Sequence, residues 1–282
     1  MKIAISLDSA CDVSEEVKRE YDFKIVPFGV TMGDRFFYDG EVSTLEIFEY
    51  ADSHKVLPKT NAVNEEAFKE HFTKILKDYD AIIHFDISSE MSSAYNNAVN
   101  AAKNFGNVYV IDSRTLSTGM ALEAIYAKKL ADKGVMIEEI VEKVKARIPS
   151  VQASFVIERL DYLYKGGRCS SLALFGANLL KLRPEIEVLG GKMGSTAKFR
   201  GRMQDVVTKY CSSTLGKYNN PDKSVIFITH SMATPEMVEA AKAVVKEYGF
   251  ENVYETTAGC TVSSHCGKNT LGILYINDGG KD

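Results

Sequence analysis

The sequence has no hydrophobic run long enough to span a membrane. Its longest apolar stretch, residues 172–182, is interrupted by Gly176, Asn178 and Lys181, whereas a spanning helix needs about 20 apolar residues. Residues 1–8 reach an acid too soon for the apolar core of a signal peptide. We therefore expect a cytoplasmic protein without stable membrane insertion, and we interpret residues 172–182 as a helix of the core.

Cysteines are few and far apart, and their number is odd. The five are Cys11, Cys169, Cys211, Cys260 and Cys266. Without a signal peptide, this set fits reduced thiols better than a disulfide framework. Cys260, His265 and Cys266 lie close together in the sequence, but their spacing matches no common zinc motif, so we expect no metal site.

Positive charge is not in excess, and the fingerprints of cofactor enzymes are absent. The net charge is -4 and the pI is about 5.8, which argues against a duplex-binding surface because phosphate contacts need clustered Lys and Arg. The patterns GxGxxG, GxSxG and HExxH do not occur. We therefore expect no nucleic-acid partner and no resident cofactor.

What the sequence does contain is enough apolar residues to bury a large core, because 45% of its 282 residues are hydrophobic. In the first half, strand-like apolar runs alternate with amphipathic segments, which predicts parallel strands joined by crossover helices. These runs are residues 2–7, 23–30, 81–87 and 108–111. We therefore predict an α/β protein whose N-terminal domain, residues 1–150, holds a Rossmann-like parallel sheet.

Several positions in this half have the side chains that begin helices. Asp12 and Ser43 are each followed three residues later by a glutamate, which is the spacing of a capping box, and Asn64 precedes two more glutamates. We expect a helix after each. Further helices are predicted at residues 93–104 and 117–148, the second broken at residues 133–134.

The pattern changes near Pro149, where we place the domain boundary and predict an α+β domain over residues 151–282. Paired glycines at 190–191 supply the positive φ angles of a tight hairpin turn. The strands that we expect are residues 151–157, 185–189, 195–199, 224–229, 252–256 and 271–276, with helices before and between them, including 235–248. Residues 263–267 are expected to form a polar loop between two strands.

Polar loops follow the predicted strands or precede helices, where open α/β sheets usually bind ligands. They are residues 8–9, 60–61, 88–93 and 112–113. Each alone is more often a helix cap than a ligand site, because Ser, Thr, Asn and Asp satisfy free backbone N–H groups. The segment that begins at Ser92 also starts a helix, whose N–H groups can bind an anion.

Two further segments carry groups that suit a carboxylate. His265 can donate a hydrogen bond to an anion, although a lone histidine in a loop is usually incidental. Arg168 follows two glycines, and its guanidinium suits either a carboxylate contact or a clamp on backbone carbonyls. The sequence leaves these two roles equally open.

Short motifs occur along almost the whole chain in an order that is typical of one family. They are Asp8-Ser9 with Asp12, Pro27, Tyr38-Asp39-Gly40, Pro58-Lys59-Thr60, Ile87-Ser88-Ser89-x-Met91-Ser92 with Tyr95 and Ala98, Ile111-Asp112-Ser113, Leu160-x-Tyr162-Leu163-x-Lys165-Gly166-Gly167-Arg168, Pro184 and His265-x-Gly267. In this combination the chain resembles the DegV family. That resemblance implies a two-domain α/β carrier that holds a long-chain fatty acid in a tunnel between its domains and takes part in phospholipid metabolism.

The resemblance also implies roles for individual residues. The family's carboxylate-binding positions correspond to Thr60, Ser92 and His265, and the family presents its fatty acid to a fatty-acid kinase subunit that makes an acyl phosphate. Further ligand-site candidates are Asn61, Ser93, Arg168 and Cys266, and candidates for docking the kinase are Lys198, Arg200 and Arg202. Three places depart from the family pattern: Asn61 replaces Ser, Ser93-Ala94 replaces Gly-Thr, and Lys268-Asn269 replaces Pro-Gly.

Two other functions remain open from the residues. Ser92 and His265 with an acid such as Asp8 would suit a lipid hydrolase or acyltransferase, although the nucleophile elbow of such enzymes is missing. A lipid-sensing regulatory protein would need the same pocket as a carrier. We favour a carrier that is not itself an enzyme.

Overall fold

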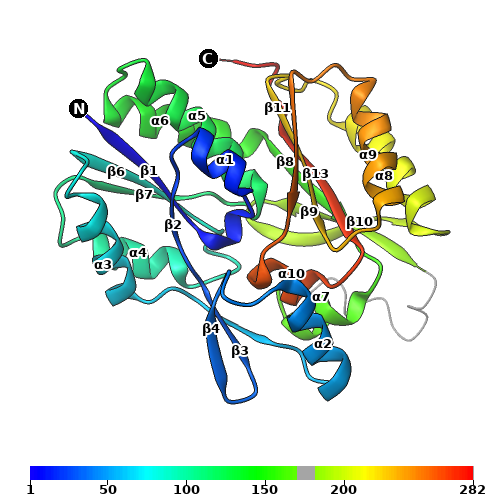
Figure 1. Cartoon of the computed structure of the whole chain (residues 1–282). Coiled ribbons are helices and arrows are strands. Elements are labelled where there is room, and N and C mark those ends of the chain that lie inside the picture. The colour runs from blue at the N-terminus through cyan, green and yellow to red at the C-terminus, as the bar shows by residue number, and fades with distance from the viewer. Residues whose placement is uncertain (170–181, 282) are drawn as a thin grey trace.

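The computed structural model describes residues 1–169 and 182–281, which form three sheets and their covering helices (Figure 1). The helix expected at residues 172–182 lies outside the described residues except for its last position. No helix in the described ranges is both long enough and apolar enough to cross a membrane.

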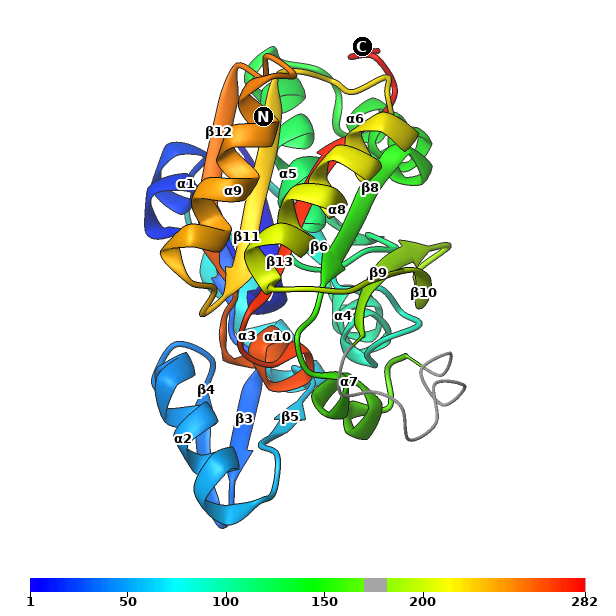
Figure 2. The same cartoon turned by 90° about the vertical axis from the view of Figure 1, so that its right-hand side faces the viewer.

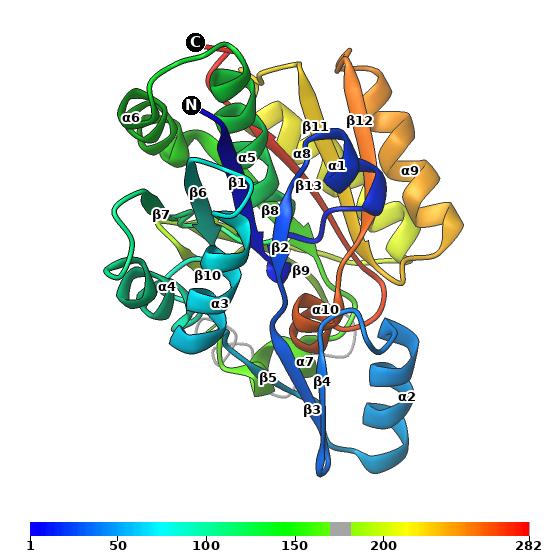
Figure 3. The ribbon, with the colours of Figure 1, turned by 60° about the vertical axis from the view of Figure 1, so that its left-hand side comes forward.

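The N-terminal half forms the parallel sheet that the sequence predicts. Its strands, in the order β2-β1-β6-β7, are β1 (Ile3–Asp8), β2 (Lys24–Val26), β6 (Ala81–Asp86) and β7 (Val108–Asp112). The helices around it are α1 (Glu15–Glu20), α3 (Glu65–Ile75), α4 (Ala94–Ala102), α5 (Thr118–Asp132) and α6 (Ile137–Arg147). α3 and α4 pack together on one side of the sheet, and α5 and α6 pack together on the other (Figure 3).

The C-terminal half forms a mixed six-stranded sheet in the order β10-β9-β8-β13-β11-β12. Its strands are β8 (Val151–Val156), β9 (Arg183–Leu189), β10 (Lys192–Phe199), β11 (Val225–Ser231), β12 (Asn252–Thr257) and β13 (Thr270–Ile276). Its helices are α7 (Leu160–Gly166), α8 (Met203–Lys217), α9 (Pro235–Lys246) and α10 (Cys260–Cys266). α8 and α9 cover one face of the sheet (Figure 2), and β9 and β10 form the predicted antiparallel hairpin.

A third, three-stranded sheet was not predicted. It consists of β3 (Gly29–Met32), β4 (Arg35–Tyr38) and β5 (Lys59–Asn61) in the order β4-β3-β5, and α2 (Thr44–His54) lies beside it. The prediction of one strand over residues 23–30 is therefore wrong. The chain leaves the parallel sheet at Val26, passes through Pro27, which cannot donate to a sheet ladder, and enters the small sheet at Gly29.

Local capping signals predicted two helix starts correctly and one incorrectly. Ser43 and Glu46 form the expected reciprocal capping box, and Asn64 accepts the N–H of Ala67 at 2.9 Å. α1 is instead capped by Ser14. Asp12 has a positive φ of 52° at the end of a short 3-10 helix, and its carboxylate bonds elsewhere, as described below.

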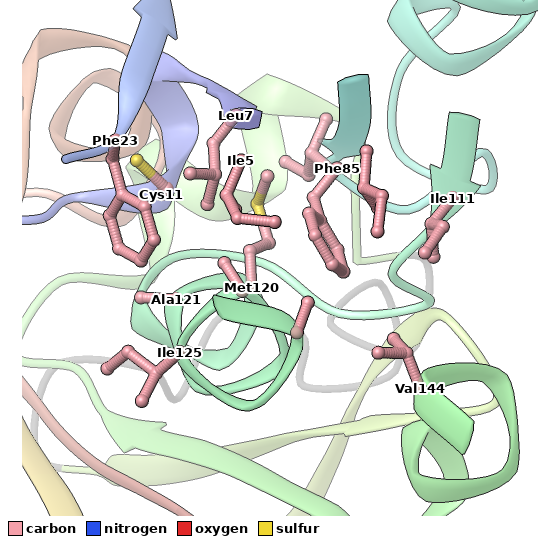
Figure 4. Packing of buried hydrophobic residues seen from close by; sticks show 14 of the residues in the cluster. Ile5, Leu7, Cys11, Phe23, Phe85, Ile111, Met120, Ala121, Ile125 and Val144 are labelled. Atoms are coloured by element: carbon pink, nitrogen blue, oxygen red, sulfur yellow. The ribbon is translucent and has the colours of Figure 1, made fainter. Parts of the chain in front are cut away.

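The two large sheets share one hydrophobic cluster, because α5 lies between them and contacts β1 and β6 on one side and β8 and β13 on the other. Figure 4 shows Met120, Ala121 and Ile125 of α5 packed toward Leu7 and Phe85 of the parallel sheet. The parallel sheet ends before residue 150 and the mixed sheet begins after it. The division into folding units at residues 1–150 and 151–282 stays a prediction.

Candidate functional site

The three sheets meet around a cavity of about 310 Å³. Most of its wall is apolar, and the side chains that form this part come from the segments after β2, β6 and β7, from β8, β10 and β13, and from α7 and α10. They include Phe28, Ile87, Met91, Leu116, Ala153, Phe155, Leu163, Met193, Val262 and Leu274. Thr60, Ser92 and His265, which are 205 positions apart from first to last, line the same cavity.

The cavity follows the direction of β13. Thr270, Gly272 and Leu274 line it in alternation, as residues on one face of a strand do, and they span about 14 Å at ~3.4 Å per residue. Thr270 donates a hydrogen bond to the carbonyl of Cys266 at 2.9 Å, beside His265. Leu274 lies opposite Ala153 of β8. The polar end therefore lies near α10, and the far end is apolar.

The polar end is organised by a direct contact between Thr60 and His265. Thr60 lies on β5, opposite Val30 in the small sheet, and His265 lies in the last turn of α10. Their Oγ1 and Nε2 atoms are 2.9 Å apart. The expectation of a loop at residues 263–267 is therefore wrong, since most of this segment belongs to a helix whose axis direction positions the imidazole.

Two acids of the N-terminal half hold α10 in place. Asp12 accepts the N–H of Gly259 at 2.8 Å, and Asp39 accepts the N–H of Cys260 at 2.8 Å and that of Thr261 at 3.1 Å. These bonds satisfy N–H groups at the start of the helix that have no partner within it. Sequence reasoning quoted both acids as motif residues and expected Asp12 to cap a nearby helix, but it connected neither acid with α10, because the groups that they cap lie more than 200 residues away.

His265 is held as a neutral imidazole. Burial lowers its pKa to about 4, with a smaller contribution from the Arg168 guanidinium. Its Nδ1 atom is buried and has no hydrogen-bond partner among the described residues. This face of the ring packs on Gly166, the last residue of α7, where a Cβ atom would lie 2.4 Å from Nδ1.

Gly166→Ala should therefore weaken the fatty-acid binding that the family resemblance implies by about tenfold while leaving the fold intact. The φ angle of Gly166 is not positive, so alanine fits the backbone, but its methyl group must displace the imidazole and so disturb the contact of that ring with Thr60. The expected loss of affinity corresponds to one charge-assisted hydrogen bond between His265 and the carboxylate of the ligand. Palmitate titration measures it, and Gly216→Ala in α8, which meets no atom within 4 Å, is the matched control. An unchanged affinity for Gly166→Ala would show that the ring position does not matter.

The pKa of His265 predicts a specific proton NMR result. Its ring signals should not titrate from about pH 7.5 to about pH 5.5 in the folded protein, whereas unfolded histidine titrates near 6.5. Because the folded pKa is the lower one, the unfolded chain binds the extra proton in this range, so this group removes stability as the pH falls toward about 4. His265→Gln assigns the signal. A folded-state midpoint near 6.5 would contradict the buried neutral imidazole.

Ser92 lies in a turn that other side chains fix. Its Oγ accepts the N–H of Ala94 at 3.2 Å, which leaves the hydroxyl hydrogen available to an acceptor in the cavity. The same turn is fastened by Ser88, which donates to the carbonyl of Gly191 at 2.8 Å, and by Asp8, which accepts the N–H of Ile87 at 2.7 Å. The hydroxyls of Thr60 and Ser92 and the ring of His265 can therefore face one ligand head group.

Three of the four secondary candidates also line the cavity: Ser93, Arg168 and Cys266. Arg168 donates to the carbonyls of Gly166 at 2.7 Å and Met91 at 3.4 Å, so in this structure it acts as the carbonyl clamp that joins α7 to the Ser92 turn. Burial raises the pKa of the Cys266 thiol to about 12, which keeps it protonated.

The remaining candidates lie elsewhere. Asn61 does not line the cavity, because its amide donates to Thr31 at 2.9 Å in the small sheet. Lys198, at the end of β10, and Arg200 and Arg202, which follow it, are exposed and outside the cavity, and Arg202 pairs with Asp205 at 3.1 Å. A docking function for these three cations stays a prediction.

The groups that a serine hydrolase would use are not arranged as a triad. The Nε2 atom of His265 contacts the hydroxyl of Thr60, and no acid among the described residues bonds to its Nδ1 atom. Asp8 accepts the N–H groups of Ala10 and Ile87 instead. Among the described residues, the site offers hydrogen-bond donors to an anion and forms no hydrogen-bonded pair that would activate Ser92 as a nucleophile.

Comparison with known proteins agrees with the motifs. The family model described as "Uncharacterised protein, DegV family" matches residues 2–278. The chain belongs to the DegV family. The DegV fold is also seen in a family member from Thermus thermophilus, whose structure has a TM-score of 0.91 at 22% identity and covers 99% of this chain and 100% of that one.

Two other similar proteins are named for the ligand that they bind. A protein of Thermotoga maritima named fatty acid-binding protein is 29% identical over 96% of both chains. The solved structure of a stearic acid-binding protein from Eubacterium ventriosum is 25% identical, has a TM-score of 0.85 and covers 98% of both chains.

Proposed function

We propose that this DegV protein binds a long-chain fatty acid, with the acyl chain in the apolar cavity and the carboxylate at Thr60, Ser92 and His265. The observation that carries the proposal is the uneven polarity of the cavity, with hydrogen-bond donors near α10 and mostly apolar side chains along the rest. The reported ligands of the two relatives described above support the same class of molecule.

The energetics favour such a ligand. Burying about fourteen methylenes at ~0.8 kcal/mol each contributes on the order of 11 kcal/mol before the cost of association. An ionised carboxylate cannot enter an apolar cavity without donors, and two hydroxyls and a neutral imidazole supply donors without adding a charge. Binding therefore combines a large apolar contribution with a smaller polar one that selects the head group.

As a carrier, the protein presents the bound carboxylate to a fatty-acid kinase subunit. A carboxylate oxygen would form a bond to the terminal phosphorus of a nucleoside triphosphate held by that subunit, and the nucleoside diphosphate would leave. The exposed Lys198, Arg200 and Arg202 support docking of an acidic partner surface. The product would be an acyl phosphate, the activated form in which the chain enters phospholipid synthesis.

Head-group recognition can be tested with one pair of ligands and one variant. Ser92→Ala should weaken palmitate binding by about tenfold, since a hydrogen bond to a charged group contributes about 1.5 to 3 kcal/mol. Hexadecanol should bind less tightly and respond less to the substitution, because it lacks the anion. Calorimetric titration of both ligands against both proteins measures this. Equal losses for the two ligands would mean that Ser92 only maintains the turn.

A further inference from the structure

A second cavity, of about 570 Å³, adjoins the acyl cavity at its polar end. Thr60, Arg168 and His265 line both cavities. These residues therefore form a shared wall, with the apolar tail site on one side and the second cavity on the other. If a ligand's head group is held at this wall, any atoms attached to it on the side opposite the tail extend into the second cavity.

The second cavity is cationic. Lys55, which follows α2, Lys59 of β5 and Lys165 of α7 line it, and we call these three residues the lysine vestibule. No Asp or Glu lines it in the part of the chain that the structure describes. Residues 55–59 and the distant Lys165 thus bring three like charges to one hollow beside the carboxylate donors.

The vestibule lysines differ from nearby cations in having no acidic partner among the residues that the structure describes. Lys268 pairs with Asp52 at 3.5 Å and Arg159 with Asp161 at 2.8 Å. No side-chain hydrogen bond or ion pair of Lys55, Lys59 or Lys165 is formed within residues 1–169 and 182–281. The three lysines are exposed, and three cations on one hollow without acids create a positive potential that attracts an anion.

A fatty acid alone does not supply that anion, because its carboxylate is held at the shared wall. We propose that the lysine vestibule binds the phosphoryl group of an acyl phosphate. This inference rests on the proposed function. In an acyl phosphate the phosphorus is joined through one oxygen to the carboxyl carbon, on the side opposite the tail. Lysine ammonium groups suit its oxygens as compact charges with several donors, and the product of phosphoryl transfer would stay bound to this chain.

The test compares two ligands that share a tail. One is palmitate, and the other is the β-ketophosphonate analogue of palmitoyl phosphate, in which a CH2 group replaces the bridging oxygen. Both are titrated against the wild type and the triple variant Lys55→Ala, Lys59→Ala, Lys165→Ala at an ionic strength of about 0.15 M. The matched control is Lys209→Ala, Lys223→Ala, Lys246→Ala, which removes three exposed lysines that do not line the vestibule.

The vestibule variant should lose about tenfold or more in affinity for the phosphonate and less than about threefold for palmitate, while the control variant changes neither by more than about threefold. Retained palmitate binding shows that the variant is folded. Equal losses for both ligands, or an unchanged phosphonate affinity, would overturn the vestibule assignment and leave the fatty-acid site standing. Failure of the wild type to bind palmitate would instead overturn the proposed function.

Discussion

Thr60→Val should weaken palmitate binding by about 10-fold to 100-fold. Valine keeps the branched shape and the strand preference of threonine, but it removes the hydroxyl that lies 2.9 Å from Nε2 of His265. The carboxylate loses one donor, and the imidazole loses its hydrogen-bond partner in the site. Each bond to a charged group contributes about 1.5 to 3 kcal/mol. A fluorescent fatty acid displaced by palmitate gives the affinity of both proteins.

The neighbouring strand offers a matched control for that experiment. Thr31→Val makes the same chemical change in the small sheet, where the Thr31 hydroxyl accepts a hydrogen bond from Asn61 rather than contacting the cavity. It should leave palmitate affinity within about twofold of the wild type. A similar loss in both variants would indicate damage to the small sheet and would remove Thr60 from the head-group site.

Ala153→Leu should shorten the acyl chain that the cavity accepts. Ala153 lies opposite Leu274 at the apolar end, so a leucine there fills space that the last methylenes of a long chain would occupy. If about three methylenes are excluded at ~0.8 kcal/mol each, palmitate binding weakens about 50-fold. The change is measured from the affinities of saturated fatty acids with ten to eighteen carbons, in steps of about two carbons.

The chain-length series contains its own control. The shortest acids do not reach Ala153 if the carboxylate is held near α10, so their affinity should be unchanged in the variant. A uniform loss for all lengths would mean that leucine disturbs the fold, since overpacking a core costs about 1 to 3 kcal/mol. Unchanged palmitate binding would mean that the tail does not follow β13.

The parts of the fold that sequence predicts well are those decided by neighbours in the chain. Ser43 and Asn64 cap helices through residues three positions away, and the glycines at 190–191 fix a hairpin within its own turn. The apolar runs of β1, β6 and β7 predict buried parallel strands for a similar reason. Each of these signals depends on a few adjacent residues, so they can be recognised without knowledge of the tertiary structure.

The missed elements depend on distant partners. β5 has three residues and exists because Thr60 pairs with Val30 of β3, which no local pattern reveals. α10 has the composition of a polar loop, and it is helical with its first N–H groups bonded to Asp12 and Asp39. Sequence reasoning therefore placed His265 in a loop although it identified the residue itself.

The candidate site was predicted through the family resemblance rather than through spacing. Thr60, Ser92 and His265 come from different elements, and only the folded chain brings them to one cavity. The packing of Gly166 against His265 depends on the contact between α7 and α10, and the lysine vestibule requires α7 to lie beside residues 55–59. A run such as Lys165-Gly166-Gly167-Arg168 indicates a turn, but it does not show which side chain the glycine accommodates.

Mass spectrometry of the purified protein tests the central claim most directly. The intact protein should carry a long-chain fatty acid, or should take up palmitate or oleate when the lipid is added, and an organic extract should identify the acid. Ser92→Ala and Thr60→Val should retain less of the same ligand. A wild-type protein that is purified without lipid and also fails to bind added palmitate and oleate would contradict the account.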